Sequence, residues 1–375
     1  MPKLQPQPDT VICHECALSV EIPTLNHKQK AHCPRCGFTL TAKNDNAIDG
    51  IIASALASLI LLFATIPFDF LSFSAQGQKQ TMDMLSGIDT LISNDYFSLA
   101  LLQTIAIFFI PLILILGFLY LLIPLRLYNQ PPQGAAFVFK LIFALLPWGM
   151  VEIFLVGALV SLIKITSMAD IGLGSSFVAY CLFTITMIIM LTYVDKHQLQ
   201  RWLQLPIHHH QPHPDSVQHT WSLIITACVC YVPASVLPIM NTRFLGQDDP
   251  STILGGVVLL WNYESYFIAS VIFIASVMIP ILKILALVVL NLSIQKRYQY
   301  LRRQRTLLYR ATEIIGRWSM IDVFVVAILV SLVQLGNTMS IYPGPASIAF
   351  SAVVIITILA ANSFDSTRIW SVENK

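Results

Sequence analysis

The stretch GRWSMIDVFVVAILVSLVQL, residues 316–335, decides the fold of this chain, because it is apolar enough to cross a bilayer and yet contains one acid, Asp322. A crossing needs about 20 mostly apolar residues in a helix. A charge near the centre of such a helix costs roughly 2.5–3.5 kcal/mol on insertion scales, so it usually faces the bundle interior and has a partner. The stretch therefore predicts a transmembrane helix with a functional buried acid.

The composition places the whole chain in a membrane. Hydrophobic residues make up 56% of the 375 residues and charged residues only 11%, whereas soluble domains carry about 25% charged residues. Eight apolar windows are long enough to cross, and they lie near residues 48–68, 99–124, 136–163, 173–194, 221–240, 266–292, 314–335 and 346–362. The sequence thus predicts an all-α polytopic membrane protein with eight transmembrane helices.

The distribution of basic residues predicts the orientation. Residues 1–10 lack the basic start followed directly by an apolar run that marks a signal peptide. With eight crossings, 18 of the 22 Lys and Arg residues fall on the same side of the membrane as the N-terminus. Cytoplasmic loops are the ones enriched in these residues. We therefore expect the N- and C-termini in the cytoplasm. The net charge of only +2 favours no nucleic-acid partner.

The chain contains an internal duplication. WGMVEIFLVGALVSLIKI (148–165) aligns with WSMIDVFVVAILVSLVQL (318–335) at an offset of 170 residues, which places Glu152 opposite Asp322. Two proline pairs keep nearly the same offset, namely Pro67 with Pro233 and Pro111 with Pro280. The pattern predicts two tandem four-helix repeats. Since each repeat has an even number of crossings, both share one orientation and are related by an axis along the membrane normal.

Four cysteines precede the first crossing in the pattern C-x2-C-x16-C-x2-C: Cys13, Cys16, Cys33 and Cys36. Two closely spaced thiolate pairs supply the tetrahedral sulfur site that Zn²⁺ prefers. Because disulfides are rare in the cytoplasm, we predict a structural zinc ribbon with one Zn²⁺ per chain. An iron–sulfur or redox site is the alternative. Four protein ligands leave no open position for catalysis, so the zinc is expected only to fold the ribbon.

A second ribbon would precede the second repeat, but LQLPIHHHQPHPDSVQHTW (203–221) contains no cysteine. Its histidines could bind a metal adventitiously, but we interpret the segment as a flexible, degenerate linker. The predicted segments are a cytoplasmic zinc ribbon (1–45), a first four-helix repeat (46–197), a His-rich cytoplasmic linker (198–220) and a second four-helix repeat (221–375).

The second repeat contains a predicted polar network around Asp322. A helix rises about 1.5 Å per residue, which places Asp322 roughly 12 Å and Lys283 roughly 17 Å from the inner ends of their helices, so Lys283 is the expected partner. Thr357 reaches nearly the same depth as Asp322. Ser319 lies one turn from Asp322, and Ser276 lies two turns outward from Lys283.

Two interpretations of this network stay open. It is either a proton relay or conformational switch, or a fixed ion pair that joins helices. Buried ion pairs often contribute little net stability, whereas Asp, Lys and hydroxyl chains in membranes often relay protons, which favours the relay. In the first repeat the proline offset places Leu114 at the position of Lys283. Glu152 is therefore expected to be protonated or to face a water-filled cavity.

Several stretches resemble the paraquat-inducible protein A family over nearly the full chain. They are the ribbon CHEC...CPRC, WSLIITACVCYVPASVLPIM (221–240), IASVIFIASVMIPILKILALVVL (268–290), GRWSMIDVFVVAILVSLVQL (316–335) and YPGPASIAFSAVVIITILAANSFDSTRIW (342–370). The second repeat matches more sharply than the first. Within the family, the likeness is greatest to the branch that serves an envelope-spanning tunnel.

The resemblance implies a multi-pass inner-membrane protein of a Gram-negative bacterium. Such a protein passes phospholipid to or from a periplasmic tunnel of MCE (mammalian cell entry) domains. The resemblance also implies that Lys283, Asp322 and Thr357 form a network that couples transport to protons. Family members commonly carry two zinc ribbons, and this chain keeps one.

The sequence argues against an ATP-driven enzyme, because no glycine is followed by lysine and the phosphate-binding loop G-x-x-x-x-G-K-[ST] is therefore absent. We expect no catalytic residues. Phospholipid transfer to an MCE tunnel is the predicted function. The alternatives are a proton-coupled exporter of small toxic solutes and a membrane anchor for the tunnel.

Overall fold

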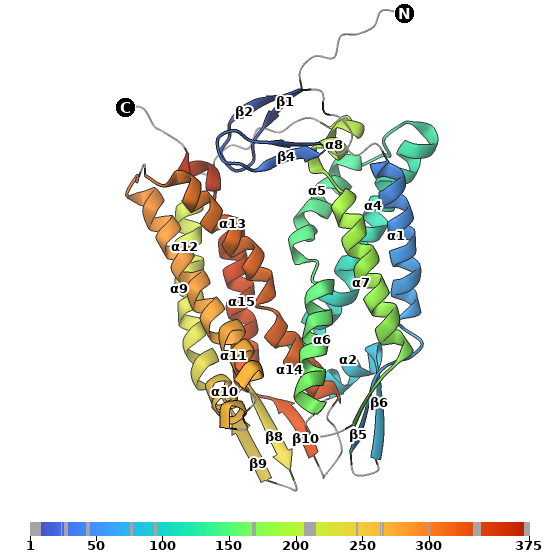
Figure 1. Ribbon diagram of the computed structural model, residues 1–375, viewed down its shortest axis with the longest axis vertical. Coiled ribbons are helices and arrows are strands. Elements are labelled where there is room, and N and C mark those ends of the chain that lie inside the picture. Colours follow the sequence, from blue (N-terminus) through green and yellow to red (C-terminus); the bar gives the residue numbers. More distant parts are fainter. Residues whose placement is uncertain are drawn as a thin grey trace, which may run out of the picture.

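The computed structural model describes most of the chain. The described residues are 9–23, 25, 29–42, 46–75, 78–93, 96–166, 170–205, 215–244, 247–262, 264, 266–298, 300–332 and 339–370. The histidines at 208–210 and 213 of the predicted linker lie outside these residues. Two bundles of helices stand side by side, with a small β domain at one end and two small sheets at the other (Figure 1). We call these the ribbon end and the sheet end.

Eight helices in the described part of the chain are long and apolar enough to cross a membrane, which confirms the predicted number. They are Ala47–Ala64, Phe97–Tyr128, Ala135–Leu162, Ser175–Tyr193, Ser216–Val236, Ala269–Gln295, Arg302–Ser331 and Pro345–Ser363. Many apolar side chains on them are exposed, such as Ile60 at 69% and Val236 at 68%. An apolar outer surface of this kind suits contact with lipid tails.

Each repeat is built from the same series of elements. The first contains α1 (Ala47–Ala64), α2 (Met84–Ser93), α3 (Phe97–Thr104), the π-helix η1 (Ile105–Phe109), α4 (Ile110–Tyr128), α5 (Ala135–Leu145), the 3₁₀ turn η2 (Leu146–Trp148), α6 (Val151–Thr166), α7 (Ser175–Tyr193) and α8 (Lys196–Trp202). The second contains α9 (Ser216–Val236), α10 (Ile253–Asn262), α11 (Tyr266–Phe273), the π-helix η3 (Ile274–Met278), α12 (Ile279–Gln295), α13 (Arg302–Trp318), α14 (Ile321–Leu332), α15 (Pro345–Ser363) and the 3₁₀ turn η4 (Ser366–Ile369). In each repeat the first long helix packs along the last, α1 on α7 and α9 on α15.

A three-stranded antiparallel sheet in each repeat was not predicted. The strands are β5 (Asp69–Ala75), β6 (Gln78–Asp83) and β7 (Asp170–Leu173) in the first repeat, and β8 (Met240–Phe244), β9 (Gln247–Ser251) and β10 (Met339–Pro343) in the second. Their orders, β6-β5-β7 and β9-β8-β10, are equivalent. A hairpin after the first helix of each repeat is joined by a strand that leads into the last helix, at the sheet end (Figure 1).

A glycine at the end of the third strand permits close backbone contact in both repeats. A Cβ on Gly174 would lie 1.8 Å from the carbonyl oxygen of Asp69, and one on Gly344 would lie 2.1 Å from that of Pro238. The Gly344 N–H also donates to the Ile239 carbonyl at 2.8 Å. A side chain at either position would therefore separate the last helix from the hairpin.

The segments that carry the two matched acids are broken helices. α13 ends at Trp318 and α14 begins at Ile321, and in the first repeat α6 begins after the break that follows η2. Asp322 and Glu152 consequently lie in the first turns of α14 and α6. The N-terminal end of a helix carries partial positive charge and favours a carboxylate. This local geometry explains why the opening stretch tolerates an acid.

The repeats meet along α6 and α14, which pack on each other. Phe154 and its equivalent Phe324 contact directly, with ring centroids 5.6 Å apart and planes at 85°. A Cβ on Gly157 of α6 would lie only 3.1 Å from the Phe324 Cβ. Equivalent residues of a duplicated chain can touch each other only near the axis that relates the copies, so this axis runs between α6 and α14.

Candidate functional site

The ribbon end carries two β-hairpins whose turns hold the four cysteines. β1 (Asp9–Ile12) pairs with β2 (Ser19–Ile22), and β3 (Lys30–His32) pairs with β4 (Thr39–Ala42). Cys13 accepts a backbone hydrogen bond from Ala17 at 2.9 Å, and Cys33 accepts the equivalent bond from Gly37 at 2.9 Å. Both Ala17 and Gly37 have positive φ angles, 54° and 74°. The two turns are thus copies of one tight knuckle.

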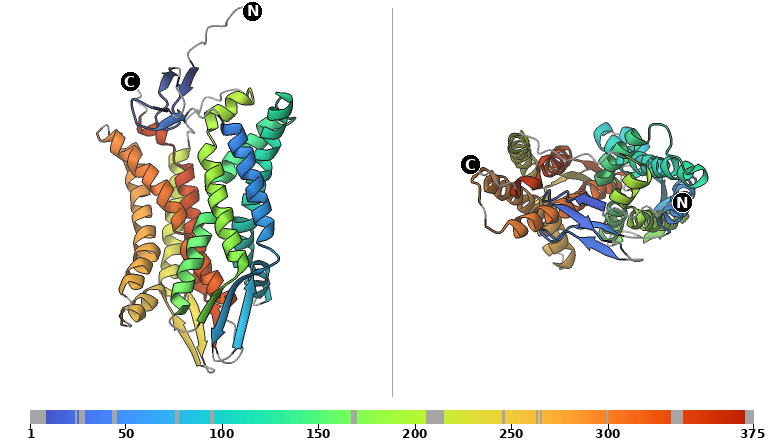
Figure 2. Two further views of the ribbon diagram at one scale, coloured as in Figure 1. Left: turned by 45° about the vertical axis from the view of Figure 1, so that its right-hand side comes forward. Right: turned by 90° about the horizontal axis from the view of Figure 1, so that it is seen from above.

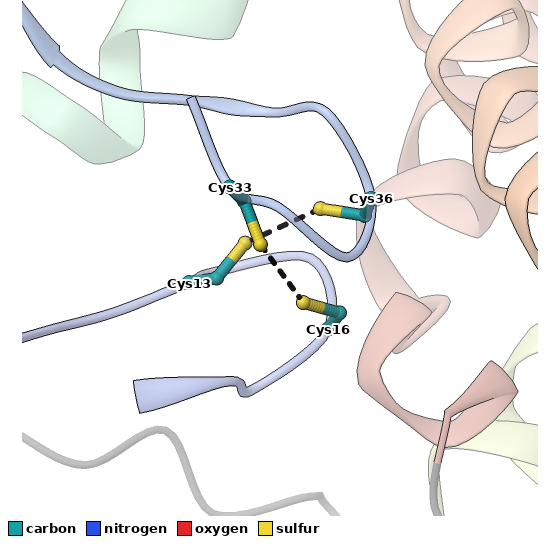
Figure 3. Close-up of side chains that lie close together, drawn as sticks. All are labelled: Cys13, Cys16, Cys33 and Cys36. Atoms are coloured by element: carbon teal, nitrogen blue, oxygen red, sulfur yellow. Dashed lines mark hydrogen bonds between the residues drawn. The ribbon is translucent and has the colours of Figure 1, made fainter. Parts of the chain in front are cut away.

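The four sulfur atoms gather at one point between the knuckles (Figure 3). All four cysteines are buried, and their Sγ atoms lie within 4.8 Å of one another. The Cys13–Cys36 and Cys16–Cys33 sulfur pairs are each 3.5 Å apart. Four thiolates about 2.3 Å from one Zn²⁺ would be about 3.8 Å apart in a tetrahedron. The donor set therefore fits a metal ion and is compatible with zinc.

The ribbon contacts both repeats, and Figure 2 shows it above them from the side and from the end. On the first repeat, Asp195 accepts hydrogen bonds from Thr41 Oγ1 at 2.9 Å and from the Ala42 N–H at 2.8 Å. On the second repeat, the partner is Arg310 of α13, which pairs with the buried Glu15 at 3.3 Å. Burial raises the pKa of the Glu15 carboxyl, and Arg310 offsets only part of that rise.

A cavity of about 320 Å³ lies below the ribbon, between the two repeats. Its charged lining consists of Glu15, Lys283, Arg310, Glu313 and Arg317. Apolar side chains from both repeats complete it, among them Leu146 and Ile358. The cavity is therefore amphipathic and combines three basic and two acidic groups with hydrocarbon walls.

Lys283 and Thr357, two of the predicted network residues, lie together beside this cavity. Lys283 is 3% exposed, and its Nζ donates to Thr357 Oγ1 at 2.9 Å. A Cβ on Gly316 of α13 would lie 2.8 Å from the same Nζ. The Lys283 ammonium thus lies between Gly316 of α13 and Thr357 of α15. Its pairing with Asp322 stays a prediction.

The other predicted network residues occupy separate places. Ser319 lies in the break before α14 and is 1% exposed, and its Oγ has no hydrogen-bond partner among the described residues. Ser276 is buried within η3, directly before the proline-containing start of α12. π-Helical turns in α-helices frequently mark functional sites.

Glu152 has a basic neighbour that the sequence analysis did not predict. Its Oε1 lies 4.0 Å from Arg317 Nη1, and both side chains are 37% exposed. The search for a partner within the first repeat missed this contact, because Arg317 belongs to the second. The sequence held one indication of this contact, because Arg317 directly precedes the repeated motif that starts at Trp318. The structure shows that the two copies of this motif meet at the axis. Arg310 and Gly316 carried no comparable signal.

Comparisons with known proteins match nearly the whole chain. The family model of paraquat-inducible protein A matches residues 48–204 and 217–373, one copy on each repeat. "Intermembrane transport protein PqiA" of Escherichia coli K12 is 35% identical over 96% of this chain and 95% of its own length. "Lipophilic envelope-spanning tunnel protein A" of the same organism is 28% identical over 97% and 92%.

A more distant relative, "Probable intermembrane transport protein" of Haemophilus influenzae, is 25% identical over 97% of this chain and 96% of its own length. No solved structure matches. The match of one family model to each half agrees with the duplication in the fold. The chain belongs to the paraquat-inducible protein A family.

Proposed function

We propose that this chain is an inner-membrane transport subunit that transfers phospholipid between the membrane and a periplasmic tunnel of MCE domains. In this arrangement the ribbon end lies in the cytoplasm and the sheet end lies in the periplasm. The protein is not an enzyme, and its zinc is structural. The observation that carries the proposal is the 35% identity, over nearly the full chain, to a protein named for intermembrane transport.

The cavity supports a lipidic substrate. A phospholipid has a charged headgroup next to apolar chains, and the cavity presents the same combination of groups. Lys283 and Arg317 are basic groups in its lining, whereas Ile358 and Leu146 form apolar wall. Because the cavity lies between the repeats, a relative movement of the repeats would change its volume. A transporter requires that its substrate site change when its two halves move relative to each other.

The buried polar residues of the second repeat support proton coupling. Lys283, Thr357 and Asp322 come from α12, α15 and α14, so a proton that changes one contact changes how three helices associate. In the proposed cycle, Asp322 and Lys283 exchange a proton as the repeats move, with Ser319 and Ser276 extending the polar path. Glu152 of the first repeat pairs with Arg317 of the second, so a movement between the repeats would change this contact as well.

The test is photocrosslinking of lipid at two positions in whole cells. A photoreactive residue replaces Asn362, which lines the cavity, and in a matched control it replaces Val289, whose side chain is 53% exposed on α12. Mass spectrometry then identifies the attached molecules. We expect phospholipid at both positions, and we expect Asp322→Asn to reduce capture severalfold at position 362 alone.

Other outcomes favour the alternatives. Capture at 289 without capture at 362 would identify an anchor for the tunnel, and transport of small solutes by the purified chain in liposomes without a tunnel partner would identify an exporter. Asp322→Asn should also preserve expression and abolish envelope protection. Full protection by that variant would contradict the proton relay.

A further inference from the structure

We propose that Arg310, a residue of the membrane domain, completes the four-cysteine metal centre from outside the ribbon, so that metal retention and docking of the ribbon on the second repeat are one coupled equilibrium. The sequence predicts a self-contained ribbon whose metal only folds the ribbon. The contacts of Arg310 point to a centre shared between two parts of the chain.

Among the described residues, the Arg310 guanidinium has four polar or cation–π contacts, and each is with the ribbon. Its Nη2 donates to the Cys36 carbonyl oxygen at 3.3 Å and lies 3.6 Å from Cys36 Sγ. Its Nε lies 3.3 Å from Glu15 Oε2. Its guanidinium carbon lies 5.1 Å from the ring centroid of Phe38. One planar cation on α13 thus binds a ligand sulfur, the knuckle backbone and two flanking side chains.

Charge explains why such a contact matters for a metal. Four thiolates around one divalent cation leave a net charge of −2, and the cysteines are buried. A buried net charge is costly unless it is paired or hydrogen-bonded. Arg310 supplies both a positive charge and an N–H donor to the sulfur, and donors in the outer shell of a metal site orient its ligands and adjust their basicity.

The contact is reciprocal. If docking against Arg310 strengthens metal binding, metal binding must strengthen docking by the same factor. The coupling also reaches the transport site, because Arg310 and Gly316 lie on the same helix and both line the cavity with Lys283. Removing the metal would therefore loosen the ribbon from α13 above the cavity.

A chelator-release assay on the full-length zinc-loaded protein tests the proposal. An excess of a chromophoric chelator is added, and the rate of zinc release is measured for the wild type, Arg310→Gln, Arg310→Lys and Arg126→Gln. Arg126 is an arginine of the first repeat whose side chain is 59% exposed and pairs with Asp49, and it serves as the matched charge control. Outer-shell substitutions typically weaken metal binding by 10–100-fold. We expect release at least about tenfold faster in Arg310→Gln, an intermediate rate in Arg310→Lys and the wild-type rate in Arg126→Gln.

Equal release rates in all four proteins would overturn the proposal, and so would equal acceleration by Arg126→Gln. A second measurement leaves Arg310 in place and follows docking directly. Arg35 of the ribbon stacks over Trp370 at 4.7 Å, and the Trp370 Nε1 donates to Thr306 of α13 at 3.0 Å, so this tryptophan reports docking. Chelation should change the fluorescence component that Trp370→Phe removes. An unchanged component after complete zinc removal would contradict coupled docking.

Discussion

At the scale of residues, the lack of a side chain at Gly316 leaves space for the Lys283 ammonium. The Nζ occupies the space into which a side chain at 316 would project, and from there it reaches Thr357. A buried lysine needs such a partner, since an unpaired charge inside a membrane protein is expensive. A glycine in the middle of a helix weakens that helix slightly. Here the missing side chain makes room for a functional one.

Gly316→Ala is therefore expected to keep the fold and lose function. The added methyl group would lie 2.8 Å from Nζ and 3.0 Å from Cε, so the flexible lysine must leave Thr357, while the helix itself gains propensity. Envelope protection in cells should fall to the level of Lys283→Met, with little change in melting temperature. The double variant should be no worse than either single one. Full protection by Gly316→Ala would refute this account.

Individual residues were predictable where their spacing carried the information. The cysteine pattern predicted a metal site because two C-x2-C pairs match the geometry of two knuckles. Helical depth grouped Thr357 with Asp322 and named Lys283 as the partner of Asp322, whereas the contact that the structure gives is the one between Lys283 and Thr357. The contacts of Arg310 and Arg317 were not predictable. Each joins segments far apart in the sequence, and only the packing of the ribbon and of the two repeats brings their partners near.

At the scale of elements, the approach of the last helix of each repeat to its hairpin depends on a glycine. Gly344→Ala would place a methyl group on the Pro238 carbonyl oxygen. Overpacking of this kind typically costs about 1–3 kcal/mol, so we expect a clearly lower melting temperature by thermal unfolding in detergent. Gly256→Ala is the matched control, because a Cβ there meets nothing within 4 Å. Equal melting temperatures for both variants would contradict the close approach.

The hairpin of the first repeat should respond to pH. Asp69 and Asp83 face each other across β5 and β6, and desolvation together with Asp69 raises the pKa of Asp83. A raised carboxyl pKa in the folded state stabilises at acid pH, and this contribution is lost as the pH rises through that pKa. Asp83→Asn should thus raise the melting temperature more at pH 7 than at pH 4. Asp89→Asn, at an exposed position of α2, is the matched control for removal of one carboxylate. An equal change in melting temperature at pH 4 and pH 7 would contradict a raised pKa of Asp83.

The type and number of helices were predictable, but their interruptions were not. A hydropathy window averages about 20 residues, so the breaks before Glu152 and Asp322 are hidden within apolar runs. The six strands of the two sheets are short and follow helices closely, which leaves no long alternating pattern to detect. The strands β7 and β10 also pair with strands far away in the sequence, which a local pattern cannot reveal.

At the scale of the whole molecule, the duplication was visible in the sequence and is confirmed by the fold. The constant offset between the two motifs predicted parallel repeats about one axis, and the Phe154–Phe324 contact places that axis between α6 and α14. The ribbon breaks the symmetry, because it precedes the first repeat alone yet contacts both. Its position could not be predicted, since no motif indicates which surface a zinc ribbon covers.

Loss of the metal site should reduce the amount of the whole protein. Cys33→Ser with Cys36→Ser removes two of four ligands, so the knuckle bound to Arg310 loses its metal. We expect loss of zinc by elemental analysis and a severalfold lower abundance in membranes by immunoblotting. Cys228→Ser, an exposed cysteine of α9, is the control and should keep both. Unchanged zinc content in the double variant would be incompatible with a four-cysteine site.

Asp195 and Arg310 hold opposite margins of the ribbon, one on each repeat. The two repeats are therefore joined at two levels, by the ribbon at one end and by the packing of α14 on α6 and α2 toward the other. Ser331 of α14 also donates to the Gly87 carbonyl of α2 at 2.9 Å. A movement that enlarges the cavity must then pivot on the α14 contacts and shift the ribbon that spans both repeats.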